Sequence, residues 1–196
     1  MTGTDLLRAG VIAGREEVDA QGGSAMRKCC QHWGVLSLLV MGIGLLLAST
    51  DVRAETLKWR QSEHVTKTES IFPVGDVPGH IVGAGEGGGL AFFENGEFAT
   101  FSSTYAVDYT NGSGAHWAYS LYTFEDGSNF VIKGQGTTTA EQGGRISVFK
   151  GTFSINGGSG RFKGIQGSGS YTGRRLAPLA AGAEGYRDFT ATYTLP

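Results

Sequence analysis

The stretch Leu90-Ala-Phe-Phe-Glu-Asn95-Gly96-Glu-Phe-Ala-Thr-Phe101 decides the fold class. Two runs that carry aromatic residues flank an Asn-Gly pair, which tolerates the positive φ angles of a two-residue hairpin turn. Residues 117–133 repeat this arrangement around Glu125-Asp126-Gly127-Ser128. Both stretches therefore predict antiparallel hairpins.

Residues outside these turns alternate with the period of two that is typical of strands. Phe189 and Tyr193, for example, share one face of the segment 188–195, while threonines occupy the other face. Similar alternation runs through Ala99, Phe101, Ser103, Tyr105, Val107 and Tyr109, and through Trp117, Tyr119 and Leu121. Together with the runs 57–68, 146–155 and 164–172, these segments predict about eight strands at a spacing of about 10–15 residues.

The even spacing and the absence of a long helical pattern favour an all-β protein, an eight-stranded antiparallel β-barrel. A closed barrel is preferred over a sandwich because closure leaves no unpaired edge strand. Two stretches interrupt the strand pattern. We expect residues 83–89 (GAGEGGG) to form a flexible connection and residues 174–185 to form a longer loop before the last strand.

The composition excludes several classes of protein. The chain has 196 residues, with 16 Lys and Arg against 18 Asp and Glu, and this balance argues against a nucleic-acid partner or an anionic membrane surface. The 33 glycines occur with only 4 prolines, so neither a collagen-like repeat nor a proline-rich linker fits. Tight turns between aromatic strands explain the glycine content better.

The N-terminal part has the order of a secretory signal peptide over residues 26–54. Met26-Arg27-Lys28 is a positive start, Val35–Ala48 is an apolar run, and Val52-Arg53-Ala54 ends in small residues suited to cleavage. The apolar run is shorter than the roughly 20 residues that span a bilayer, although an uncleaved anchor is the alternative. The pattern favours Met26 as the initiator, which would make residues 1–25 an over-extension of the sequence; the alternative is a disordered leader that begins at Met1.

Cleavage after Ala54 predicts a secreted or periplasmic domain over residues 55–196 with no stable membrane insertion. Both cysteines, Cys29 and Cys30, lie in the segment that would be removed. The mature domain would therefore have no disulfide, no thiol nucleophile and no Cys-ligated metal.

No motif for a cofactor, metal or nucleophile is present in the expected domain. The glycine run 83–89 lacks the Lys-Ser/Thr ending of a phosphate loop. His64, His80 and His116 are scattered, without the close spacing of metal ligands, so barrel-end or surface positions explain them better. We therefore predict no cofactor and no metal.

Glu63 is the candidate catalytic residue, because it lies on the first expected strand among Trp59, His64 and Val65. A carboxylate that faces the interior of a barrel would be desolvated and suited to proton transfer. The alternative is that Glu63 faces solvent. The candidate ligand-binding residues, which would line a cavity if the interior is not simply filled, are Tyr105, Trp117, Tyr119 and Phe153.

The stretch FSINGGSGRFKGIQG, from Phe153 to Gly167, resembles a signature of the allene oxide cyclase and dirigent barrels. The match to their glycine pattern runs from Gly157 to Gly167, and Tyr119–Gly136 is similar to the preceding hairpin of allene oxide cyclases. The resemblance covers about residues 70–172. It implies an eight-stranded barrel with a central cavity, often assembled into trimers, and in the plant cyclases a buried Glu assists cyclisation of a fatty-acid epoxide.

The resemblance weakens at the residues that carry the chemistry. Glu63 is the counterpart of the cyclase Glu only if the first strands align, and Ala91 stands where the plant enzymes have a Cys. The leading hypothesis is therefore an exported barrel that binds a small apolar or amphipathic molecule. The alternatives are an isomerase that cyclises an epoxide, using Glu63, and a non-catalytic dirigent-type or structural module.

Overall fold

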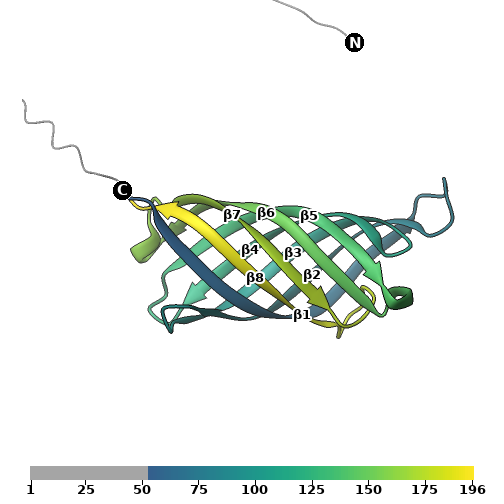
Figure 1. Ribbon diagram of the computed structural model, residues 1–196, viewed down its shortest axis with the longest axis horizontal. Helices are drawn as coiled ribbons and strands as arrows, with labels where there is room; N and C mark the ends of the chain where they lie inside the picture. Colours follow the sequence, from purple (N-terminus) through teal and green to yellow (C-terminus); the bar gives the residue numbers. More distant parts are fainter. Residues whose placement is uncertain (1–52) are drawn as a thin grey trace, which may run out of the picture. The chain divides into compact units, whose positions relative to one another are not determined.

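The computed structural model describes residues 53–196 (Figure 1). The predicted leader over residues 1–25, both cysteines and all but the end of the predicted signal segment over residues 26–54 lie outside these residues. Within the described part of the chain, no helix is long and apolar enough to cross a membrane.

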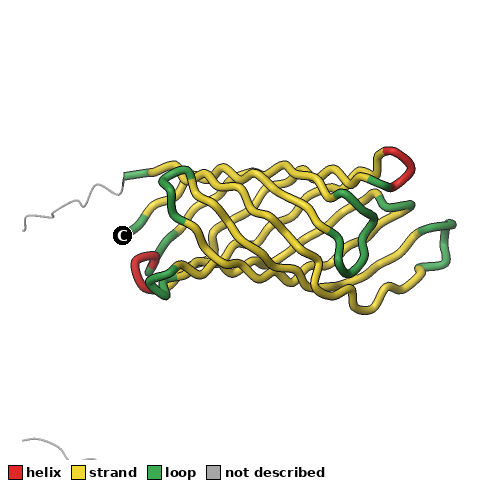
Figure 2. Tube along the Cα trace, turned by 90° about the horizontal axis from the view of Figure 1, so that it is seen from below, coloured by secondary structure: helices red, strands yellow, loops and turns green. Residues whose placement is uncertain are grey.

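Eight antiparallel strands form a closed barrel in which each strand pairs with its neighbours in sequence and β1 also pairs with β8. Two short 3-10 turns, η1 (Gln142–Gly144) and η2 (Gly160–Phe162), lie at opposite ends of the barrel (Figure 2). The strands are β1 (Glu55–Pro73), β2 (His80–Phe93), β3 (Phe98–Thr110), β4 (Ser113–Phe124), β5 (Asn129–Glu141), β6 (Ile146–Ser159), β7 (Gln166–Arg175) and β8 (Glu184–Thr194). The predicted fold class is confirmed.

The interior of one half of the barrel is filled by aromatic rings. Trp59 of β1 stacks on Phe189 of β8, with ring centroids 4.7 Å apart. The ring of Tyr122 stacks on Phe130 at 4.9 Å. Offset and edge contacts of this kind stabilise packing beyond the area that they bury. This half of the barrel is therefore a packed aromatic core.

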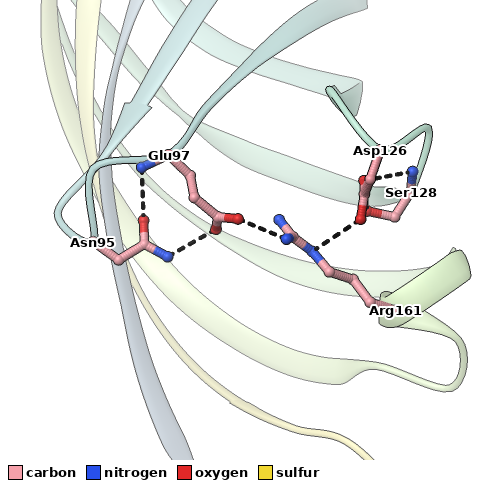
Figure 3. Close-up of polar contacts among 5 residues, drawn as sticks. All are labelled: Asn95, Glu97, Asp126, Ser128 and Arg161. Carbon is pink, nitrogen blue, oxygen red and sulfur yellow. Dashed lines mark hydrogen bonds and ion pairs between the residues drawn. The ribbon is translucent and has the colours of Figure 1, made fainter.

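Phe162 closes the end of this aromatic half. The η2 turn directs its ring against Phe124 and Phe130, at centroid distances of 4.9 and 5.3 Å. Arg161 covers the rings from outside and pairs with Glu97 at 2.6 Å and Asp126 at 3.8 Å (Figure 3). These contacts tie the β2–β3 and β4–β5 turns to η2 and seal the end.

The expectation of a flexible connection over residues 83–89 is wrong, because all seven residues belong to β2. Gly85 and Gly87 face the interior, where a side chain would meet existing groups. A Cβ atom on Gly85 would lie 2.5 Å from the Lys67 carbonyl oxygen and 2.6 Å from Cζ of Tyr105, and one on Gly87 would lie 3.1 Å from the His64 carbonyl oxygen. Glycine therefore occurs here because larger neighbours occupy the space inside the barrel.

The predicted loop over residues 174–185 is shorter than expected. Strand β7 continues to Arg175 and β8 begins at Glu184, so the connection covers only residues 176–183. This difference matters for the interior, because it turns Arg175 from a loop residue into a buried strand residue.

Candidate functional site

The second half of the barrel encloses a narrow cavity that opens at the end opposite Phe162. The space free of protein atoms amounts to about 600 Å³ including the mouth, but only about 50 Å³ is open to the centre of a water-sized sphere. A water needs roughly 10–15 Å³ by the latter measure, so the cavity accommodates a few waters or a small polar group. Its polar lining includes Glu63, Tyr105, Tyr109, His116, Tyr171 and Arg175.

Glu63 points into this cavity and is 8% exposed. Its carboxylate forms an ion pair with Arg187 of β8, the strand next to β1 around the barrel. The Arg187 guanidinium also lies over the ring of Phe149, 4.2 Å from the centroid. Burial lowers the pKa of Arg187 to about 10, so this side chain is still charged at neutral pH. The Glu63–Arg187 pair therefore contributes no net charge to the cavity.

His116 joins two strands through hydrogen bonds across the cavity. Its Nδ1 atom lies 2.9 Å from Oγ1 of Thr138, and its Nε2 atom lies 2.6 Å from the Tyr171 hydroxyl. The Tyr109 hydroxyl also contacts Oγ1 of Thr138, at 2.7 Å. Burial, aided by the nearby charge of Arg175, lowers the pKa of His116 to about 4. The imidazole is therefore neutral at physiological pH and can donate at only one of its nitrogens.

Arg175 is a buried cation whose partners in the described part of the chain are neutral groups. It is 6% exposed, and it donates to the Ala177 carbonyl and the Ser147 hydroxyl, each at 3.0 Å. No ion pair joins it to any carboxylate among the side chains that the structure describes. Burial lowers the pKa of Arg175 from its very high ordinary value. A buried guanidinium bonded only to neutral groups is costly unless a counter-anion accompanies it.

The charges of the cavity sum to one positive charge. Among the lining residues, the Glu63 carboxylate is balanced by Arg187, His116 is neutral, and Arg175 remains. Burial also raises the pKa of Tyr105 and of Tyr109, so these hydroxyls keep their protons and can donate hydrogen bonds. The arrangement is suited to a small anion that accepts hydrogen bonds.

The structure places the predicted site residues in three different environments. Glu63 and Tyr105 line the cavity. Phe153 is 4% exposed and lies within the aromatic core, with its ring 5.6 Å from that of Trp59. The catalytic role of Glu63 and the ligand-binding roles of Tyr105 and Phe153 remain predictions.

The expectation that Trp117 and Tyr119 line the interior is wrong. They are 45% and 49% exposed on the outside of β4, because the inward positions of this strand belong to His116, Ser120 and Tyr122. Alternation alone defines two faces of a strand and does not say which one is buried. The large aromatic side chains of Trp117 and Tyr119 favoured the wrong face of β4 as the inner one.

The sequence did not identify Arg175 and Arg187 as cavity residues, and it predicted a barrel-end or surface position for His116, which is 7% exposed and lines the cavity. For Arg187 a signal existed, because it shares the alternating face of Phe189, Ala191 and Tyr193. Extending that face by one position would have placed a cation inside the barrel.

Comparisons with known proteins identify no family for this chain. No protein-family model matches it, and no curated protein matches it. Among solved structures it is similar to the pterocarpan synthase dirigent protein GePTS1, with 13% identity, a TM-score of 0.43 and coverage of 85% of this chain and 100% of that chain. The pterocarpan synthase dirigent protein PsPTS1 gives 14% identity and the same TM-score over 74% and 97% of the two chains. Similarity this low says nothing about function.

Proposed function

We propose that this protein is an exported barrel that binds a small amphipathic carboxylate in its cavity. The observation that carries the proposal is Arg175, a buried guanidinium whose hydrogen-bond partners among the described residues are all neutral. A carboxylate accepts two parallel hydrogen bonds from a guanidinium and would supply the missing negative charge. The Tyr109 hydroxyl lines the same cavity and can donate to the ligand when Thr138 donates to it, whereas the Tyr105 hydroxyl already donates to the Lys67 carbonyl at 3.3 Å.

The width of the cavity limits the size of the group that it can hold. About 50 Å³ of accessible space suits a carboxylate with a short apolar chain, and Phe149 and Val107 provide apolar contacts along the wall. A longer chain would have to extend through the mouth. The ligand class that fits best is therefore a short-chain carboxylic acid or a larger molecule with such a headgroup.

Thermal unfolding with butanoate and 1-butanol tests this proposal, because the two probes share a chain length and differ in charge. Butanoate should stabilise the wild-type domain, by about 2.7 kcal/mol at a hundredfold excess over its Kd, whereas 1-butanol should not. Arg175→Met should abolish the stabilisation and Arg175→Lys should weaken it. Arg174→Met is the matched control, since Arg174 precedes Arg175 on β7 but is exposed.

Equal stabilisation of Arg175→Met and wild type by butanoate would disprove the role of Arg175. An absence of any effect on the wild-type domain would disprove binding of short carboxylates altogether. Circular dichroism of each variant checks that the barrel is still folded.

Acid–base catalysis is a second candidate function, favoured by the inward position of Glu63. Gly87 has no side chain to cover Oε1 of Glu63, and neutral His116 lines the same cavity. An isomerase that cyclises an epoxide would use such groups to move a proton. Turnover of a cyclisable fatty-acid epoxide by the wild type, lost in Glu63→Gln, would support this function, and full turnover by the variant would remove Glu63 from it.

A further inference from the structure

Trp117 and Tyr119 form an aromatic pair on the outer surface of the barrel. They are two positions apart on β4, so their side chains leave the same face, and nearly half of each is exposed. The ammonium group of Lys133 lies 5.6 Å from the centroid of the Tyr119 ring. Exposed aromatic residues next to polar groups are typical of surfaces that bind a ligand or partner.

Strands β5, β6 and β7 follow one another in the barrel wall (Figure 1). Their register extends the Trp117 and Tyr119 positions into two rows of polar side chains. These rows run across the strands, because directly paired residues on one face of a sheet lie side by side. One row is Trp117, Gln135, Thr152 and Ser170, and the other is Tyr119, Lys133, Ser154 and Ser168. The surface beside the aromatic pair is therefore rich in hydroxyl and amide groups.

An open groove of about 1200 Å³ is lined by the residues of these rows except Tyr119 and Ser170. Trp117 lines it, and Lys133 and Lys150 are the charged residues of its lining. No carboxylate lines the groove among the residues that the structure describes. Neither lysine forms an ion pair with a described carboxylate. The groove therefore combines a stacking surface, hydrogen-bonding side chains and positive charge.

We infer that this groove binds an acidic polysaccharide. The C–H face of a pyranose ring packs against an aromatic ring, and sugar hydroxyls pair with groups such as those of Gln135 and Thr152. Uronic-acid carboxylates would lie near Lys133 and Lys150. Two lysines are few for a nucleic-acid backbone, whose binding grows with the number of phosphates neutralised. The same face of a second copy would bring lysine against lysine.

Isothermal titration with hexagalacturonate, and with maltohexaose as the neutral hexasaccharide, tests the inference. The wild-type domain should bind hexagalacturonate more tightly than maltohexaose. Trp117→Ala should weaken binding at least tenfold, and the double change Lys133→Gln, Lys150→Gln should remove the preference for the acidic sugar. Phe92→Ala is the matched control, because Phe92 is an outward aromatic residue of β2, 53% exposed, that does not line the groove.

Four results would overturn the inference. The first is no binding of hexagalacturonate by the wild type, and the second is an equal loss in Phe92→Ala and Trp117→Ala. The third is tighter binding of a thymidine oligonucleotide than of hexagalacturonate. The fourth is sedimentation of the wild type as an oligomer that Trp117→Ala converts to a monomer, which would make this face a contact between copies. Butanoate binding in the barrel is independent of all four.

Discussion

At the scale of single residues, the interior is shaped as much by missing side chains as by those present. Gly136 and Gly151 lie side by side on β5 and β6, and the Tyr171 hydroxyl occupies the space that their side chains would fill. The Tyr171 hydroxyl in turn holds Nε2 of His116. The absence of side chains at Gly136 and Gly151 therefore leaves room for the Tyr171 hydroxyl, which in turn holds the His116 ring.

Gly151→Ala should destabilise the domain, because its methyl group would collide with the Tyr171 side chain and with the Gln135 carbonyl. Overpacking of this kind costs about 1–3 kcal/mol. Gly134→Ala is the control, since its Cβ would meet Tyr171 only at 3.6 Å, an ordinary contact. Urea unfolding of both variants checks the difference, and an equal effect of the two changes would show that the space around the Tyr171 hydroxyl is not tight.

His116 should make the domain sensitive to acid. Its pKa is about 4 in the folded protein against 6.5 for an unperturbed histidine, so between these values the unfolded chain binds more protons. Stability should therefore fall as the pH falls from 6.5 to 4, by on the order of 3 kcal/mol from this residue. Urea unfolding at several pH values should show a shallower loss for His116→Gln. The same slope in wild type and variant would contradict the assignment.

At the scale of strands and turns, the sequence predicts the hairpin turns best, because the conformation of a turn depends mainly on the residues within it. The hairpin predicted at Asn95-Gly96 is present, but its connection covers residues 94–97 instead of two residues, and Gly96 has a positive φ of 88° whereas Asn95 does not. Gly127 adopts a φ of 79° in the β4–β5 turn. The run 83–89 was misjudged because its assignment to β2 depends on distant neighbours. The space beside Gly85 and Gly87 is taken by the Tyr105 side chain of β3 and by backbone carbonyls of β1, which lie far from them in sequence. For the same reason the sequence alone does not predict that Arg175 points into the barrel, since this depends on how far β7 continues beside β6 and β8.

The hairpin between β1 and β2 is held to β3 by His80. Its Nδ1 lies 2.6 Å from Asp76, its Nε2 lies 2.8 Å from Asp108, and both carboxylates raise the pKa of His80, Asp108 more strongly. The resulting stability is complete below pH 6.5 and is lost as the pH rises through the folded pKa. An NMR titration should give a His80 midpoint above 6.5 that Asp108→Asn lowers. A wild-type midpoint at or below 6.5 would contradict this.

At the scale of the whole molecule, the barrel divides into a solid aromatic half and a half with a polar cavity. Alternation and turn chemistry predict a closed barrel, but whether its interior is filled or hollow depends on side-chain volumes summed over all strands. Trp59 and Tyr122 fill one half, whereas Gly134 and Ser120 leave space in the other. This division could not be predicted without the register.

Phe162→Ala should destabilise the domain without changing the cavity, because Phe162 packs only in the aromatic half. The expected cost is about 3–5 kcal/mol for a buried aromatic residue. Arg161→Ala, which removes the partly exposed ion pairs over the same rings, should cost about 1 kcal/mol or less. Chemical denaturation measures both values. Stabilisation by butanoate should persist in each variant, and its loss in Phe162→Ala would show that the two halves are not independent.

Closure of one end by Phe162 also limits the path by which a ligand could enter and leave the proposed binding cavity. Because that end is sealed, the cavity has a single mouth, and a bound molecule would have to leave through the same mouth by which it entered. Nothing can pass through from one opening to another, and a second molecule waiting at the mouth delays departure of the first. A bulky compound that lodges there would therefore slow capture and release alike, without ever reaching Arg175.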